Sequence, residues 1–307
     1  MNEKDELIKQ LGDDLHLNEN LAKYTTMKVG GPAKYFYFAR KIDDLIRAIT
    51  ISQELKIPFF VLGSGSNIIF GDDGYHGLVI LNRTDNIAFM NDKAQVIVDS
   101  GVSLMRLITE SANHDLGGLE PLYGIPGTVG GAVYGNVGAY GLEISHYIKS
   151  ITVLKSDNKI ARYKTDWLDP KYRSTKIKQD KKKYKKSLPV VLSVTFQLMH
   201  QKNEEIVKKL QHYKKLREEK QPYNFPSAGS IFKNVGTEKE KTAGYILEQV
   251  GAKKIKIGGA EVSNKHANFI INTKNATADD VKNIITQMKI LAHDNYGVEL
   301  EEEVEIV

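Results

Sequence analysis

Apolar residues along the first two thirds of the chain follow two alternating spacings. Helical spacing predicts a helix that starts after Lys41 and stops at Pro58, and a second helix over 103–112. Short apolar runs rich in β-branched and aromatic residues predict strands at 59–62, 68–70, 78–81, 96–98, 151–154 and 190–198. Helices and strands therefore alternate in this part of the chain.

The last third has a different organisation. An amphipathic helix is predicted over 204–220, where Pro222 ends it, and another follows Thr277, which forms a capping box with Asp280, and stops at Gly297. Residues 298–306 alternate and predict a terminal strand, with Val298, Leu300, Val304 and Ile306 on one face and Glu299, Glu301, Glu303 and Glu305 on the other. We place a boundary near residue 200, giving a domain over 1–200 with its core at about 30–198, and a smaller domain over 201–307.

Composition excludes several classes of protein. The 307 residues include 41% hydrophobic and 26% charged residues, which is typical of a globular chain. The absence of cysteine excludes disulfides and thiol catalysis, and the eight histidines lack metal-ligand spacing, so we expect no metal site. The amino terminus is polar, and no stretch has the ~18 apolar residues of a membrane span, so we expect a cytoplasmic protein.

The net charge of +5 is concentrated between Lys171 and Lys186. A lysine-rich loop in solvent and a site for an anionic ligand both account for it. Nucleic-acid binding is a further alternative, but Tyr172 and Tyr184 are the only aromatic residues in the run, and the acidic carboxyl end would repel a polyanion. We expect no nucleic-acid partner.

Two glycine-rich segments are the main candidates for cofactor binding. Gly63-Ser64-Gly65-Ser66-Asn67 follows a buried strand, where free N–H groups can hold phosphate oxygens, although a tight turn would use the same residues. Ile68 replaces the third glycine of the dinucleotide fingerprint, which disfavours a Rossmann fold. The second segment comprises Gly124-Ile125-Pro126-Gly127-Thr128-Val129-Gly130-Gly131-Ala132 and Gly135-Asn136-Val137-Gly138-Ala139-Tyr140-Gly141. Together they indicate a long, phosphate-bearing cofactor, with an array of turns as the alternative.

These segments, together with Thr25-Thr26-Met27-Lys28-Val29-Gly30-Gly31-Pro32-Ala33, resemble the FAD-binding domain of the UDP-N-acetylenolpyruvoylglucosamine reductase family. Three later motifs match the family in order: Tyr172-Arg173-Ser174, Pro226-Ser227-Ala228-Gly229-Ser230-Ile231-Phe232 and Leu300-Glu301-Glu302-Glu303-Val304. The resemblance covers nearly the whole chain. It looks like the shorter form of the family, without the tyrosine-bearing insertion.

The resemblance implies an α+β protein with an FAD-binding domain of the vanillyl-alcohol-oxidase or PCMH-like type and a smaller C-terminal α+β substrate domain. It implies that NADPH reduces FAD, which passes hydride to the enolpyruvyl group of UDP-N-acetylglucosamine enolpyruvate. The product would be UDP-N-acetylmuramate, a peptidoglycan precursor. An FAD oxidoreductase of the same fold acting on another substrate is the alternative. We expect a monomer or a weak homo-oligomer.

The resemblance also assigns residues. Arg173 would stabilise the enolate, Ser230 would protonate the α-carbon, and Glu303 would assist at the carboxylate. Tyr140, Lys220 and Asn234 match substrate-binding positions, and Lys265 and His266 are interpreted as structural. Residues expected to contact FAD are Gly63, Ser64, Gly65, Ser66, Asn67, Gly124, Ile125, Pro126, Gly127, Thr128, Gly130, Gly131, Asn136, Gly138 and Ala139.

The assignment of Glu303 depends on the family motif, because spacing alone does not separate it from the other glutamates of its stretch.

Some residues depart from the family pattern. The basic insert over 176–186 and Glu305 are unusual for the family, and they bear on substrate affinity.

Overall fold

The computed structural model describes residues 3–184 and 189–307, and the chain forms two compact units. Unit 1 contains the residues up to His16, Tyr35–Ser64 and Gly77–Leu216, and unit 2 contains Leu17–Lys34, Gly65–His76 and Arg217–Val307. Neither unit is one continuous piece of chain, because 17–34 and 65–76 pack with the C-terminal residues. The predicted division at residue 200 differs from this one. It stays a prediction.

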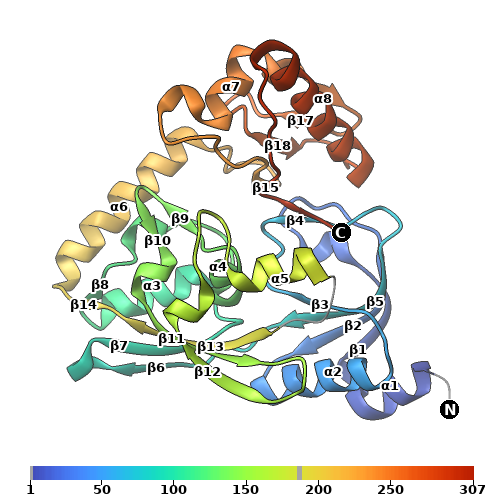
Figure 1. Ribbon diagram of the computed structural model, residues 1–307, viewed down its shortest axis with the longest axis vertical. Helices are drawn as coiled ribbons and strands as arrows, with labels where there is room; N and C mark the ends of the chain where they lie inside the picture. Colours follow the sequence, from blue (N-terminus) through green and yellow to red (C-terminus); the bar gives the residue numbers. More distant parts are fainter. Residues whose placement is uncertain (1–2, 185–188) are drawn as a thin grey trace. The chain divides into compact units, whose positions relative to one another are not determined.

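Unit 1 is a mixed α and β structure (Figure 1). Its helices are α1 (Glu3–Leu11), α2 (Ile42–Glu54), α3 (Leu104–Asn113), α4 (Val129–Tyr134), α5 (Lys176–Tyr184) and most of α6 (Asn203–Lys220). Its strands are β3 (Phe59–Leu62), β6 (Ile87–Met90), β7 (Gln95–Asp99), β8 (Leu116–Gly117), β9 (Gly138–Ala139), β10 (Leu142–Glu143), β11 (Ile148–Leu154), β12 (Ile160–Lys164), β13 (Val190–Gln197) and β14 (Met199–His200). Strands β1 (Leu15–Asn20), β2 (Pro32–Ala39) and β5 (Tyr75–Asn82) run from one unit into the other.

Two sheets organise unit 1. One has the order β1-β2-β5-β3, and its strands β3 and β5 pair in parallel, with Phe59 opposite Leu78. The other has the order β12-β11-β13-β7-β6, and all of its pairs are antiparallel. The order of the second sheet brings together strands far apart in the sequence, such as β7 and β13.

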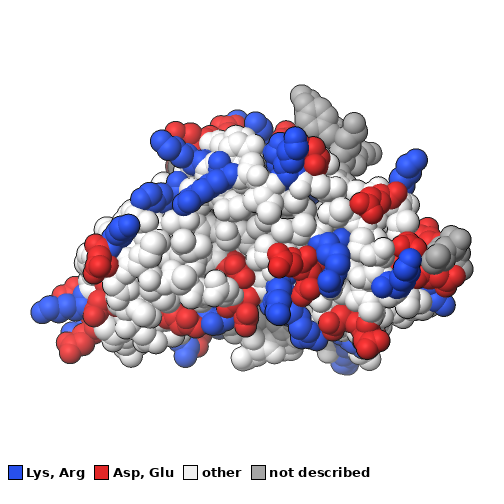
Figure 2. Space-filling view, turned by 90° about the horizontal axis from the view of Figure 1, so that it is seen from below, with Lys and Arg blue, Asp and Glu red and all other residues white. Residues whose placement is uncertain are grey.

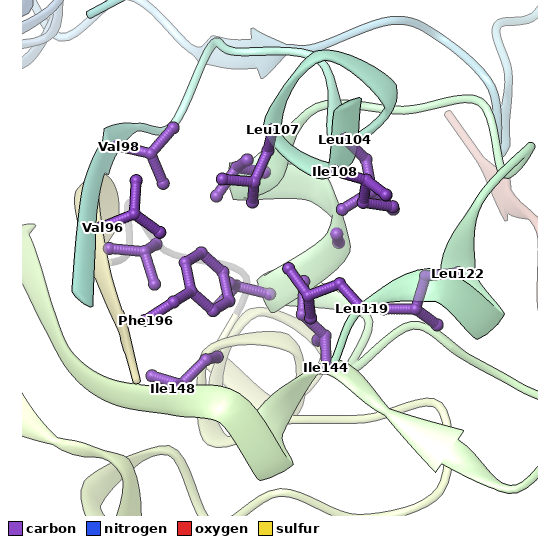
Figure 3. Close-up of a cluster of buried hydrophobic side chains, with 14 of the residues drawn as sticks. Val96, Val98, Leu104, Leu107, Ile108, Leu119, Leu122, Ile144, Ile148 and Phe196 are labelled. Carbon is purple, nitrogen blue, oxygen red and sulfur yellow. The ribbon is translucent and has the colours of Figure 1, made fainter. Parts of the chain in front are cut away.

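The second sheet carries the larger core of unit 1. Figure 3 shows Val96 and Val98 from β7 and Phe196 from β13 facing the apolar side of α3, which presents Leu104, Leu107 and Ile108. All of these side chains are at most 2% exposed. Ser103 caps α3, since its hydroxyl accepts the N–H of Arg106 at 3.1 Å. The predicted helix over 103–112 is therefore confirmed.

Unit 2 is a smaller α+β structure. Its helices are α7 (Ala243–Gln249) and α8 (Ala278–Tyr296), and its strands are β4 (Ile68–Ile69), β15 (Ser227–Ser230), β16 (Lys256–Ile257), β17 (Ala260–Val262), β18 (Phe269–Asn272) and β19 (Glu305–Ile306). One sheet has the order β15-β18-β17-β16, and β19 pairs in parallel with β4. The apolar core includes Met27, Val29 and Ile69 beside residues of the C-terminal part.

One local prediction is wrong, and one helix was not predicted. The expected strand over 298–306 is reduced to β19, because the chain bends before it and the N–H groups of Glu303 and Val304 both donate to the carbonyl of Ile231. Ile306, expected on the buried face, is 42% exposed, whereas Leu300 and Val304 are buried as expected. The second error is an omission. Helix α4 lies inside the glycine block, where its glycines conceal helical spacing.

Candidate active site

The two glycine-rich segments meet in unit 1. A Cβ atom added to Gly63 would lie 2.4 Å from Oγ1 of Thr128, so the strand end after β3 packs directly against the start of α4. The Thr128 hydroxyl accepts the N–H of Gly131 at 3.3 Å, and the N–H groups of Val129 and Gly130 donate to carbonyls of the β7–α3 connection. The first turn of α4 is therefore committed to contacts within the protein.

The glycines of the block differ in what surrounds them. A Cβ atom on Gly130 would lie 2.9 Å from Cβ of Ser100, so packing requires this glycine. Gly131 is exposed inside a helix, and an added Cβ atom would have Thr128 Oγ1 as its nearest neighbour at an ordinary 3.5 Å. Because neither packing nor backbone conformation requires a glycine at 131, the position fits a surface that a ligand approaches closely.

The segment after β3 passes into unit 2 at Gly65. Its φ of 62° is left-handed, and an added Cβ atom would lie 2.1 Å from the carbonyl oxygen of Tyr24. The Gly65 carbonyl accepts the N–H of Thr26 at 3.0 Å, and the hydroxyl of Thr26 donates to the carbonyl of Ser227 at 2.7 Å. Three motifs that are distant in the sequence therefore contact one another here.

Arg173 belongs to unit 1 and lies in a tight turn. Its backbone φ of 53° is unusual for a residue other than glycine. Its Nη2 donates to the carbonyl of Gly138 at 2.8 Å, and its guanidinium lies 4.9 Å from the ring centroid of Tyr172. Thr175, two residues later, donates through its hydroxyl to the carbonyl of Tyr134 at 2.8 Å. The turn is thus fastened to the glycine block.

Asn136 is fully buried and completes this connection. Its Nδ2 donates to Oε2 of Glu143 at 2.8 Å and to the carbonyl of Lys171 at 3.0 Å, and its Oδ1 accepts the N–H of Ser145 at 3.4 Å. The side-chain amide is therefore engaged with the protein, and so is the backbone N–H, which donates to the carbonyl of Val133 at 3.1 Å. The expected contact of Asn136 with FAD stays a prediction. Tyr140 is 43% exposed, with its ring centroid 5.1 Å from that of Tyr213 on α6.

Unit 2 brings the other two predicted catalytic residues into adjoining segments. Ser230 ends β15, and the next carbonyl, that of Ile231, accepts the N–H of Glu303 at 2.8 Å. Asn67 donates through Nδ2 to the carbonyl of Glu303 at 3.1 Å, and its own carbonyl accepts the N–H of Glu305 at 3.0 Å. The structure therefore joins Asn67, Ser230 and Glu303 by backbone and amide contacts that periodicity could not reveal.

Two of the glutamates near 303 form ion pairs within unit 2. Glu301 pairs with Lys233 at 2.9 Å, and Glu302 pairs with Lys289 at 2.9 Å. Glu303 lies at the bend just before the buried Val304 and is half-buried.

Lys220 and Asn234, the predicted substrate-binding residues of unit 2, are both exposed. Lys220 is the last residue of α6, and Nζ of Lys265 donates to the carbonyl of Glu218 in the same turn. Asn234 caps α7 in part, since its Oδ1 accepts the N–H of Ala243 at 3.1 Å.

His266 has a lowered pKa. Burial of the imidazole is the main cause, and the charges of Lys253 and Lys220 lower the pKa further.

The basic insert forms α5 as far as Tyr184. Nζ of Lys181 lies 4.5 Å from the ring centroid of Phe60, and Nζ of Lys176 lies 5.3 Å from that of Trp167, so these cations rest on aromatic faces. Lys185 and Lys186, the end of the predicted run, lie outside the described residues. On the face shown in Figure 2, basic and acidic side chains are interspersed, and wide areas carry no charge.

Residues 3–184 and 189–307 contain no cluster of three histidine, aspartate or glutamate side chains able to hold a metal ion. No helix in this part of the chain is long and apolar enough to cross a membrane.

Comparisons with known proteins cover nearly the whole of this chain. Residues 33–164 match the FAD binding domain, and residues 221–307 match the C-terminal domain of UDP-N-acetylenolpyruvoylglucosamine reductase. The reductase of Anoxybacillus flavithermus is 39% identical over 305 residues, covering 99% of this chain and 98% of the relative. That of Thermotoga sp. strain RQ2 is 38% identical, covering 98% and 96%.

A solved structure agrees with these matches. The reductase from Thermus caldophilus superimposes with a TM-score of 0.77 at 30% identity, covering 95% of this chain and 97% of the other. The predicted α+β fold, with an FAD-binding domain and a C-terminal domain of this family, is therefore confirmed. The chain belongs to the UDP-N-acetylenolpyruvoylglucosamine reductase family.

Proposed function

We propose that this chain catalyses the NADPH-dependent, FAD-mediated reduction of UDP-N-acetylglucosamine enolpyruvate to UDP-N-acetylmuramate. The proposal rests above all on a match to reductases of this name over 99% of the chain, which includes every motif discussed above. The reaction would take place in the cytoplasm and supply peptidoglycan synthesis.

The residues of unit 1 fit an FAD site. Gly131 presents open backbone where nothing in the protein requires a glycine, and the strand end at Gly63 adjoins the same helix. FAD, when bound, supplies the hydride carrier between NADPH and the substrate. The glycine block would bind and orient it, with Gly138 beside the Arg173 guanidinium.

The proposed roles of the three catalytic residues follow from charge. Addition of hydride to the β-carbon places negative charge on the α-carbon and the carboxylate, which a fixed guanidinium stabilises. Arg173 suits this role because Gly138 and Tyr172 hold its side chain. Ser230 would donate its hydroxyl proton to the α-carbon, and Glu303 would assist Arg173 at the carboxylate. Lys220 and Asn234 would bind the pyrophosphate, and Tyr140 would contact the nucleotide.

An absorption experiment without oxygen tests the proposal. NADPH should bleach the flavin band of the purified protein, and UDP-N-acetylglucosamine enolpyruvate should restore it. A band that bleaches but does not return would move the proposal to another FAD oxidoreductase of the same fold. Protein that binds no FAD would refute it.

A further inference from the structure

The segment that follows Ser230 is held on two sides within unit 2. On one side the bent C-terminal chain contacts it, because the N–H of Lys233 donates to the carbonyl of Glu301 at 2.9 Å and the carbonyl of Ile231 accepts the N–H of Glu303 at 2.8 Å. Phe232 and Glu302 form an isolated antiparallel bridge between these contacts. The positions of Ser230 and Glu303 are thus set by one short stretch of backbone.

Asn268 holds this stretch from the other side. Its Oδ1 accepts the N–H of Phe232 at 2.9 Å, its Nδ2 donates to the carbonyl of Phe232 at 2.8 Å, and its own carbonyl accepts the N–H of Ile231 at 2.9 Å. Asn268 is 3% exposed and Phe232 is 1% exposed. Water therefore cannot replace these hydrogen bonds.

The loop that carries Asn268 is itself fixed. The backbone N–H of Asn268 donates to Nδ1 of His266 at 3.2 Å, and the ring of His266 lies against Phe269 with centroids 4.9 Å apart. An asparagine amide is suited to this position because it offers a donor and an acceptor at once. Aspartate of the same shape would keep the acceptor but would set an oxygen against the carbonyl of Phe232.

We propose that Asn268 is a positioning residue for the second half-reaction, which sets the backbone from which Ser230 and Glu303 reach the substrate. This inference rests on the proposed function. Reduction of the cofactor by NADPH needs no proton from Ser230, so a displaced Phe232 backbone should leave that half-reaction intact. Oxidation by the enolpyruvyl substrate should suffer, because small misplacements of a reacting group slow a reaction strongly.

The test compares the two half-reactions of the full-length, FAD-loaded enzyme in stopped-flow absorbance. For Asn268→Asp we expect flavin reduction by NADPH to stay within about twofold of the wild type. Flavin reoxidation by UDP-N-acetylglucosamine enolpyruvate should slow by about ten- to a hundredfold. Asn268→Ala, which removes both side-chain hydrogen bonds, should show the same split if it folds.

Asn272 provides a matched control on β18, close in the sequence to Asn268. It is 8% exposed, donates through Nδ2 to the carbonyl of Met27 at 3.1 Å, and accepts the N–H of Ala276 at 3.0 Å. Asn272→Asp makes the same chemical change but leaves the Phe232 backbone alone. It should lower the free energy of unfolding as Asn268→Asp does, without slowing reoxidation selectively.

The outcomes separate the two proposals. Wild-type enzyme that is reduced by NADPH but not reoxidised by this substrate overturns the proposed function, and the role of Asn268 with it. Normal wild-type turnover with equal slowing of both half-reactions in Asn268→Asp overturns the positioning role alone. If Asn272→Asp slows reoxidation as selectively as Asn268→Asp does, the positioning role is also overturned, because the effect would then not be specific to Asn268.

Discussion

At the scale of single residues, the hydroxyl of Ser230 has a proposed role that only one half-reaction would require. Replacing Ser230 with alanine removes the proposed proton donor but leaves the glycine block of unit 1 unchanged. We expect reoxidation of the flavin by substrate to slow by about 10²- to 10⁴-fold, the usual contribution of general acid–base catalysis, while reduction by NADPH is unaffected. Ser227→Ala on the same strand is the control. Equal damage to both half-reactions would remove Ser230 from this role.

Gly131 allows a second prediction at this scale, in which one substitution raises the stability of the apoprotein and lowers its affinity for FAD. Alanine has room at this helical position and restricts the unfolded chain, so Gly131→Ala should raise the free energy of unfolding of the apoprotein by about 0.5–1 kcal/mol. The added methyl group would meet the cofactor, so FAD affinity should fall. Gly130→Ala should lower stability, because its Cβ atom meets Ser100. Thermal unfolding and FAD titration measure both effects, and unchanged FAD affinity in Gly131→Ala would refute the close approach.

Some features of the candidate site could be predicted from the sequence, and others could not. Glycine clusters and the motifs around Arg173, Ser230 and Glu303 are visible in the sequence, because they are contiguous. The hydrogen bonds of Asn136 and Asn268 are not visible, because their side-chain amides bond to residues 7 to 36 positions away and no periodic pattern marks either asparagine. From the sequence alone, a buried asparagine cannot be distinguished from an asparagine in a turn.

At the scale of elements, the start of α8 shows how a segment joins unit 2. Thr277 and Asp280 form the predicted capping box, and the two carboxylate oxygens of Asp72 accept the N–H groups of Ala278 and Asp279 at 2.8 and 3.0 Å. We expect Asp72→Ala to lower the free energy of unfolding by about 1–2 kcal/mol, because two N–H groups lose their acceptor and the helix dipole loses a favourable charge. Asp73→Ala, one residue later, is the control. Equal urea midpoints for the two variants would contradict the prediction.

Most element types followed the apolar pattern. The predicted strand at 59–62 and the helix over 204–220 agree with β3 and α6 within one residue. The pattern failed at 298–306. Apolar and acidic residues alternate there, but the N–H groups of Glu303 and Val304 both donate to the carbonyl of Ile231 instead of pairing with a neighbouring strand. It also failed at α4, where packing against Ser100 requires Gly130 although glycine has a low helix propensity.

At the scale of the whole molecule, unit 2 depends on chain from the N-terminal part. Met27, Val29 and Ile69 are at most 2% exposed within its core, and β4 is the partner of β19. A sequence read from one end to the other shows a change of pattern near residue 200, but it cannot show that 17–34 and 65–76 return to the later unit. Non-local packing of this kind leaves no periodic signal.

The C-terminal fragment 201–307 should therefore fail to fold alone. Each missing core side chain accounts for about 1.5–3 kcal/mol of burial, and domains are stable by only about 5–15 kcal/mol, so losing three together with the partner of β19 removes most of the margin. We expect the isolated fragment to show no cooperative urea transition by circular dichroism, and co-expression with 1–200 to restore one. A cooperative transition in the isolated fragment would instead establish the contiguous division at residue 200 as two autonomous domains, because 17–34 and 65–76 would then be dispensable for its core.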